Sequence, residues 1–127
     1  MAALELPDFI FSGTPSAADF IANSIYAKAI VVGSPLTPLR GLDLALEGVV
    51  YEQNGEIVGT HTAAEVMGNP LNALAWLANH LETRGLALKP GDVVITGAIS
   101  KILRPKAGDT VRARFTRLGS VAIKVVP

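Results

Sequence analysis

Two short segments of this sequence carry groups that could bind an organic acid or a metal ion. Glu5 lies inside the apolar run 2–6, and a half-buried carboxylate on such a run needs a cation or a hydrogen-bond donor. Carboxylate oxygens suit Mg²⁺ or Mn²⁺, which makes Glu5 a candidate metal ligand. The alternative is that Glu5 sits on an alternating strand and simply faces water.

The second segment, Thr96-Gly97-Ala98, directly follows the apolar run 93–95. A loop of small residues at the end of a strand exposes backbone N–H groups, and Thr96 adds a hydroxyl. These donors could bind a carboxylate or an oxo group, so Thr96, Gly97 and Ala98 are candidate substrate-binding residues. The alternative is a plain connection between elements, since such loops are common.

The remaining polar residues indicate no further catalytic site. The two histidines, His61 and His80, are interpreted as ordinary strand-end and helix-surface residues. Asp92 and Asp109 each follow a glycine and are interpreted as turn formers. The sequence has no cysteine, no H-E-x-x-H motif and no glycine motif for phosphates or dinucleotides, which excludes thiol chemistry and those motif-defined classes.

The charge and hydropathy of the chain exclude several partners. Lys and Arg together number 11, as do Asp and Glu, so no overall field attracts nucleic acid or an anionic membrane. The basic residues between 101 and 117 lack a pattern of interleaved aromatic side chains and are interpreted as a solvated face. No stretch resembles a signal peptide or a membrane span, and we expect a cytoplasmic protein.

The length and composition predict one domain that covers residues 1–127. Half of the residues are hydrophobic and 17% are charged, so a core can form and disorder is not expected. A small domain has a large surface to cover, and part of the apolar surplus is therefore expected to face a partner. This composition favours a homo-oligomer.

The first part of the chain is predicted to hold a short strand and a helix. The strand covers residues 2–6. Ser16 can cap a helix whose apolar residues recur at helical spacing from residue 18 to about residue 32. Gly33 suits the left-handed position beyond the end of that helix.

The middle of the chain is predicted to form a hairpin and a second helix. The strands 44–51 and 57–62 flank Asn54-Gly55, whose residue types tolerate the positive φ angles of a tight turn. Asn69-Pro70 opens the second helix, which runs to Gly85. Trp76 lies on the polar side of this helix, and is either covered by another segment of the chain or sits at a subunit contact.

The last third of the chain carries two similar units in which a Gly-Asp turn precedes an apolar run. The predicted strands cover residues 93–95, 110–115 and 120–126. Strands and helices follow one another irregularly, so the fold class is α+β rather than a repeated βαβ unit.

Four ordered motifs resemble the 2-keto-4-pentenoate hydratase and 4-oxalocrotonate decarboxylase family of the fumarylacetoacetate-hydrolase superfamily. They are Val66-Met67-Gly68-Asn69-Pro70-Leu71-Asn72-Ala73-Leu74-Ala75-Trp76-Leu77-Ala78, Leu88-Lys89-Pro90-Gly91-Asp92-Val93-Val94-Ile95-Thr96-Gly97-Ala98, Ala107-Gly108-Asp109 and Leu118-Gly119-Ser120-Val121. Ala3-Leu4-Glu5 extends the similarity towards the first residues. The resemblance covers the C-terminal half of the family, and implies a strand-rich mixed sheet or roll with two packed helices.

The resemblance also implies a chemistry. Family members use Mg²⁺ or Mn²⁺ to hold short 2-hydroxy-dienoate or 2-oxo acids while water adds or CO₂ leaves. Three glutamates hold the metal, of which Glu5 matches the third, and Thr96 and Gly97 match the loop against the substrate. We therefore expect a hydratase-like lyase that binds a small organic acid.

The sequence departs from the family at the metal ligands. No Glu-x-Glu pair occurs among these 127 residues, and one carboxylate binds Mg²⁺ weakly. The lyase is therefore expected to be incomplete as it stands, equivalent to the C-terminal half of a longer enzyme. The alternative is a non-catalytic oligomeric domain that keeps the fold and an organic-acid-binding pocket.

Overall fold

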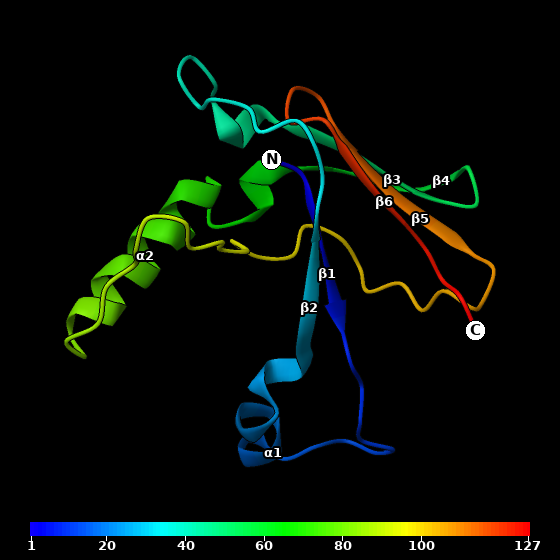
Figure 1. Cartoon of the computed structure of the whole chain (residues 1–127), viewed down its shortest axis with the longest axis horizontal. Coiled ribbons are helices and arrows are strands. Elements are labelled where there is room, and N and C mark those ends of the chain that lie inside the picture. Colours follow the sequence, from blue (N-terminus) through cyan, green and yellow to red (C-terminus); the bar gives the residue numbers. More distant parts are fainter.

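The computed structural model describes all residues 1–127 (Figure 1). The strands are β1 Ala3–Pro7, β2 Ala27–Val32, β3 Gly48–Gln53, β4 Glu56–Thr62, β5 Thr110–Phe115 and β6 Ser120–Lys124. The helices are α1 Ala17–Ala22 and α2 Pro70–Glu82, with short 3₁₀ helices η1 Ser24–Tyr26, η2 Leu44–Leu46 and η3 Ala63–Glu65. β1 and β2 form a two-stranded sheet, and the other strands form a sheet of order β4-β3-β5-β6. All pairings are antiparallel, and the α+β fold class is confirmed.

The predicted hairpin is confirmed as β3 and β4, which turn at Asn54 and Gly55 with φ angles of 54° and 85°. The Asn54 side chain donates to Asp109 at 2.8 Å and accepts the backbone N–H of Thr110 at 2.8 Å. Asp109 also accepts the N–H of Lys106 at 2.8 Å. The hydrogen bond from Asn54, followed by that from Lys106, holds the pKa of Asp109 below its ordinary value. These bonds confirm Asp109 as a turn former.

The predicted helix 17–32 is wrong beyond its first turns. Ser16 caps α1 as expected, because its hydroxyl accepts the N–H of Asp19 at 3.2 Å. The chain leaves the helix after Ala22, passes through residues 24–26 at positive φ, and continues as β2. The β-branched residues at the end of β2 fit a strand better than a helix, and pairing with β1 bonds their backbone.

Gly33 serves a different purpose from the one its position suggested. Its φ is not left-handed; a side chain here would instead collide with the backbone of Ser120. A side chain at Gly119 would likewise collide with the backbone of Ser34. The two glycines let the ends of β2 and β6 touch, and this contact joins the two sheets.

The second helix is confirmed as α2, with the Asn69 side chain accepting the N–H of Leu71 at 2.9 Å and Pro70 in the first turn. None of its residues is buried, and in Figure 1 it projects away from both sheets. Trp76 is 59% exposed and stacks on His80 with ring centroids 5.0 Å apart. No other segment of this chain therefore covers Trp76, which leaves the subunit contact as the open alternative.

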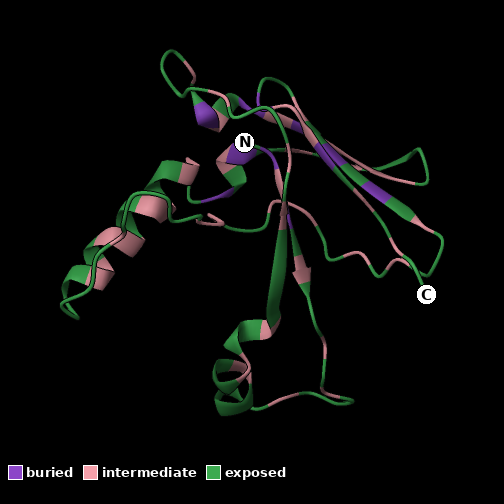
Figure 2. Cartoon of the chain, viewed as in Figure 1, coloured by how far each residue is buried: buried purple, intermediate pink, exposed green.

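The core is small and lies where β1 crosses the inner face of the four-stranded sheet (Figure 2). It consists of Ala2, Leu4, Val49, Val111, Ala113 and Val121. The accessible surface is 8694 Å², whereas a compact monomer of 13.3 kDa exposes about 6,450 Å². The chain by itself thus leaves roughly 2,200 Å² uncovered relative to that expectation.

The largest fully buried side chain is charged. Glu47 is 0% exposed, and its carboxylate accepts the Nε–H of Arg117 at 2.6 Å and the backbone N–H of Arg117 at 2.9 Å. Arg117 also donates to the carbonyl oxygen of Asp43 at 3.3 Å. These bonds satisfy a carboxylate that would be costly if left unpaired, and they tie η2 to the β5–β6 turn.

Tyr51, on the inner face of β3, packs against the same core, with Ser100 near its hydroxyl. Burial raises the pKa of the Tyr51 phenol above its ordinary value of 10.0, because it disfavours the charged phenolate; the nearby Ser100 hydroxyl acts in the opposite direction. The neutral phenol is therefore stabilised by folding.

We expect Arg117→Ala to lower the free energy of unfolding by about 3 kcal/mol, because Glu47 would lose its cation while staying buried. Arg114→Ala is the matched control, since Arg114 pairs at 2.6 Å with Glu52, whose side chain is 13% exposed where that of Glu47 is fully buried. That loss should stay below about 1 kcal/mol. Urea unfolding of both variants measures the difference, and equal losses would contradict the role given to the buried pair.

Tyr51 should make the fold sensitive to alkali. Below pH 10 both the folded and the unfolded states keep the phenolic proton; above it the unfolded chain releases the proton first, so stability falls as the pH rises towards the folded-state pKa. Tyr51→Phe should show a flatter fall in unfolding free energy between pH 9 and about 11.5. Urea unfolding across this range is the measurement, and parallel curves for both proteins would refute the assignment.

Candidate functional site

A cavity of about 710 Å³ lies between β1, the aromatic side chains near α1 and the segment 92–103. Its lining is mostly hydrophobic. Glu5 and the loop Thr96-Gly97-Ala98, which lie far apart in the sequence, both line this cavity. The structure thus brings together the two segments that the sequence singled out.

Strand β1 positions Glu5, which pairs with Ile30 of β2. The neighbouring Leu4 is buried in the core, whereas Glu5 is exposed, as expected for an alternating strand. Glu5 makes no hydrogen bond or ion pair within the chain, so its carboxylate is free at the cavity wall. The half-buried environment considered from the sequence is wrong for Glu5 in this chain.

In the loop Thr96-Gly97-Ala98, the backbone of Gly97 lies close to the buried Val66. The φ of Gly97 is 143°, an angle that residues with a side chain rarely adopt. A Cβ added at this position would lie 3.3 Å from Cγ1 of Val66. The backbone N–H groups of the loop make no hydrogen bond within the chain. They remain available as donors to an anionic ligand, together with the Thr96 hydroxyl.

The predicted strand 93–95 does not form. No backbone group between Val93 and Pro105 takes part in a backbone hydrogen bond, although the chain there runs beside the cavity. A strand requires a neighbour to complete its ladder, and this chain places none beside the segment. Asp92 at its start accepts the N–H of Lys89 at 2.7 Å, which confirms Asp92 as a turn former.

Sequence reasoning missed the aromatic wall of the cavity. Phe9 and Phe20 pack on Tyr26 with ring centroids 4.9 and 4.7 Å apart, and Arg104 lies over the Phe9 ring at 4.5 Å. Tyr26 follows Ser24 and Ile25, and all three have positive φ angles. Their spacing carries no recognisable motif, because the contact depends on β1 and β2 being paired. Tyr51, also missed, lines the cavity from β3.

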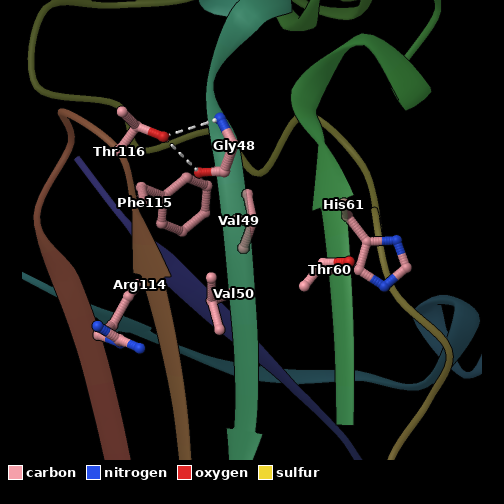
Figure 3. A pocket seen from close by; sticks show the side chains of 8 residues that line it. All are labelled: Gly48, Val49, Val50, Thr60, His61, Arg114, Phe115 and Thr116. Carbon is pink, nitrogen blue, oxygen red and sulfur yellow. Dashed lines mark hydrogen bonds between the residues drawn. The ribbon is translucent and has the colours of Figure 1, made fainter. Parts of the chain in front are cut away.

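A second hollow of about 330 Å³ lies over β3 and β4 (Figure 3). His61 and Arg114 line it, but Figure 3 shows them on either side of β3 rather than facing one another. His61 is bonded to Glu65 at 3.1 Å and Arg114 to Glu52 at 2.6 Å. The charged groups are engaged elsewhere, so this hollow has no converging chemistry.

The donor set of this chain does not by itself fit a resident divalent cation. No three His, Asp or Glu side chains lie close enough together to hold a metal ion. Mg²⁺ requires near-octahedral oxygen coordination, and Glu5 supplies one carboxylate. Asp92 lines the same cavity but is engaged with Lys89.

No helix in the structure has both the length and the apolarity to cross a bilayer.

Comparisons with known proteins agree with this fold. A 2-keto-4-pentenoate hydratase of Burkholderia vietnamiensis is 39% identical over 103 residues, which are 81% of this chain and 39% of that protein. A 4-oxalocrotonate decarboxylase of Pseudomonas putida is 35% identical over 106 residues, 84% of this chain and 40% of that protein.

Solved structures give the same result. The 4-oxalocrotonate decarboxylase from Pseudomonas putida G7, complexed with magnesium and adipate, superposes with a TM-score of 0.89 at 30% identity, covering 98% of this chain and 48% of that one. Its complex with calcium and acetate gives 0.87 at 31% identity, covering 98% and 47%. A divalent metal is therefore present in structures of this family.

The chain thus spans between two fifths and one half of the relatives that it matches. The resemblance to the hydratases and decarboxylases is confirmed. Residues 21–126 match the family model described as fumarylacetoacetate (FAA) hydrolase C-terminal, and the chain belongs to this family.

Proposed function

We propose that this chain forms the organic-acid-binding half of a hydratase-like lyase that acts on short 2-hydroxy-dienoate or 2-oxo acids. One observation carries the proposal: Glu5 and the free N–H groups of Thr96-Gly97-Ala98 line one apolar cavity. Relatives that are named hydratases and decarboxylases of such acids support it. On this proposal the remaining ligands for a divalent cation lie outside these 127 residues, among which no three His, Asp or Glu side chains gather.

The residues of this chain would bind and orient the acid. The Thr96 hydroxyl and the backbone donors of Gly97 and Ala98 would bind a carboxylate or oxo oxygen, in the manner of a small anion-binding loop. The hydrophobic lining would surround the unsaturated carbon chain and exclude water from most of it. Glu5 would lie near the polar end of the acid as a proton or cation partner.

A non-catalytic domain that binds an organic acid is the second candidate. The absence of a three-ligand cluster favours it, since the family's metal has no complete site here. The absorbance of 2-hydroxypenta-2,4-dienoate separates the two: a lyase consumes it once the missing ligands are supplied, whereas a binding domain leaves it unchanged. Self-association remains a prediction in either case, supported by the exposed Trp76.

We expect calorimetry to detect weak binding of 2-oxopent-4-enoate to the chain, and Thr96→Val to weaken it about tenfold through loss of one hydrogen bond to an anion. Thr60→Val is the matched control, because Thr60 lines the other hollow. No binding by the unaltered chain, or equal binding by Thr96→Val, would sink the proposal.

Glu5 should respond in a different way. In buffer with a chelator, Glu5→Gln should bind the acid as tightly as the unaltered chain or more tightly, because a like charge near the ligand is removed. Mg²⁺ added without the acid should give no calorimetric signal with either protein, since one carboxylate is a poor site. Tight Mg²⁺ binding that Glu5→Gln abolishes would show instead that the chain completes a metal site on its own.

A further inference from the structure

Lys101 is the only basic side chain among the residues that line the cavity of about 710 Å³. The sequence interprets the basic residues between 101 and 117 as a solvated face, whereas the structure places Lys101 at the cavity, four residues beyond Gly97. Lys101 takes part in none of the salt bridges of the chain, although Glu5 and Asp92 line the same cavity. Its ammonium group is therefore free to pair with an anionic ligand.

Two hydroxyl groups of the cavity lining accompany Lys101. Ser100 directly precedes it in the chain, and Ser100 lies near the hydroxyl of Tyr51 on β3. Tyr51 and Ser100 are both partly buried, so water screens a hydrogen bond from either of them less than it would at an open surface. A carboxylate accepts several hydrogen bonds at once, and bonds to a charged group are the stronger kind. Tyr51, Ser100 and Lys101 thus form a second set of donors, here called the distal set.

The distal set lies apart from the loop Thr96-Gly97-Ala98, to which the proposed function gives the first acid group. Between Gly97 and Lys101 the chain can span at most about 14 Å, and the flexible Lys101 side chain can shorten this gap for a ligand. The rest of the lining is mostly hydrophobic. A short apolar carbon chain with a carboxylate at each end matches this arrangement of groups.

We propose that Tyr51, Ser100 and Lys101 hold a second carboxylate, so that the cavity selects short diacids over monoacids of the same length. The inference rests on the proposed function and narrows its substrates to acids with a distal carboxylate. Lys101 determines the specificity through its charge, and the two hydroxyl groups orient the carboxylate. Because Lys101 is exposed, water and salt screen its charge, and its contribution to affinity is modest.

The test compares 2-oxoadipate with 2-oxohexanoate, which lacks the distal carboxylate, in calorimetric titrations of the 127-residue chain with a chelator present. We expect the diacid to bind about fivefold more tightly, which is the factor that one exposed ion pair supplies. Raising the salt concentration from about 0.05 M to about 0.5 M should narrow this preference, because the Debye length shortens. Equal binding of the two acids would overturn the inference and leave the proposed function standing, whereas binding of neither would overturn both.

Lys101→Met removes the charge and keeps a long side chain. It should abolish the preference by lowering the affinity for 2-oxoadipate about fivefold, while 2-oxohexanoate binds as before. Lys106→Met is the matched control, because Lys106 is also exposed and close in the chain but does not line the cavity. A preference that Lys101→Met keeps would contradict the assignment. So would one that both variants lose, since net charge would then be its cause.

Tyr51→Phe tests the hydroxyl of the distal set. The variant keeps the ring that packs against the core, so it should lower the affinity for 2-oxoadipate alone, about fivefold, through the loss of one hydrogen bond. Thr96→Val should instead weaken the binding of both acids, because Thr96 acts on the acid group that they share. An equal loss for both acids in Tyr51→Phe would contradict the role given to Tyr51.

Discussion

The buried Glu47 carboxylate and its bonds to Arg117 join η2 to the β5–β6 turn at one end of the four-stranded sheet. A charge that is fully buried must be paired, and the pairing brings η2 against the β5–β6 turn. In the same region the carbonyl of Glu47 accepts the N–H of Ala63, and the carbonyl of Leu118 accepts the N–H of Ala2. The bond from Ala2 to Leu118 places the start of β1 against the four-stranded sheet, and Glu5 of β1 lines the cavity there.

The rest of the fold buries few of its side chains. Gly33 and Gly119 allow the sheets to touch, but the core between them contains few side chains, and α2 buries none of its own. An α-helix of this length is marginal in isolation. The chain has a large exposed surface, an unpaired segment at Val93–Ile95 and an exposed Trp76. These features support the prediction that its apolar faces contact another polypeptide.

The candidate site likewise has only part of the groups that a metal-dependent site needs. The cavity offers donors for an acid and an apolar lining for its carbon chain, but a single free carboxylate for a cation. The relatives of known structure carry calcium or magnesium and are about twice as long. Under the proposed function, binding of the acid and binding of the metal need not reside in the same stretch of chain, and this chain would supply the former.

Local chemistry determined much of the structure from the sequence alone. The turn at Asn54-Gly55 was predictable because these residue types tolerate positive φ angles. The cap at Asn69 and the turns at Asp92 and Asp109 were predictable because each depends on a side chain that bonds to backbone two or three residues away. The sequence also singled out Glu5 and Thr96-Gly97-Ala98 as candidate site residues, and the structure places both at one cavity.

Tertiary structure decided the elements whose partners are distant in the sequence. Residues 27–32 became a strand because β1 lies beside them, and 93–95 failed to become one because nothing does. The burial of Glu47 and the aromatic wall at Tyr26 likewise depend on packing between segments that no local pattern connects. The physical reason is that a helix turn or a cap satisfies its hydrogen bonds within its own segment, whereas a strand or a buried charge needs a neighbour that only the folded chain, or a second one, can provide.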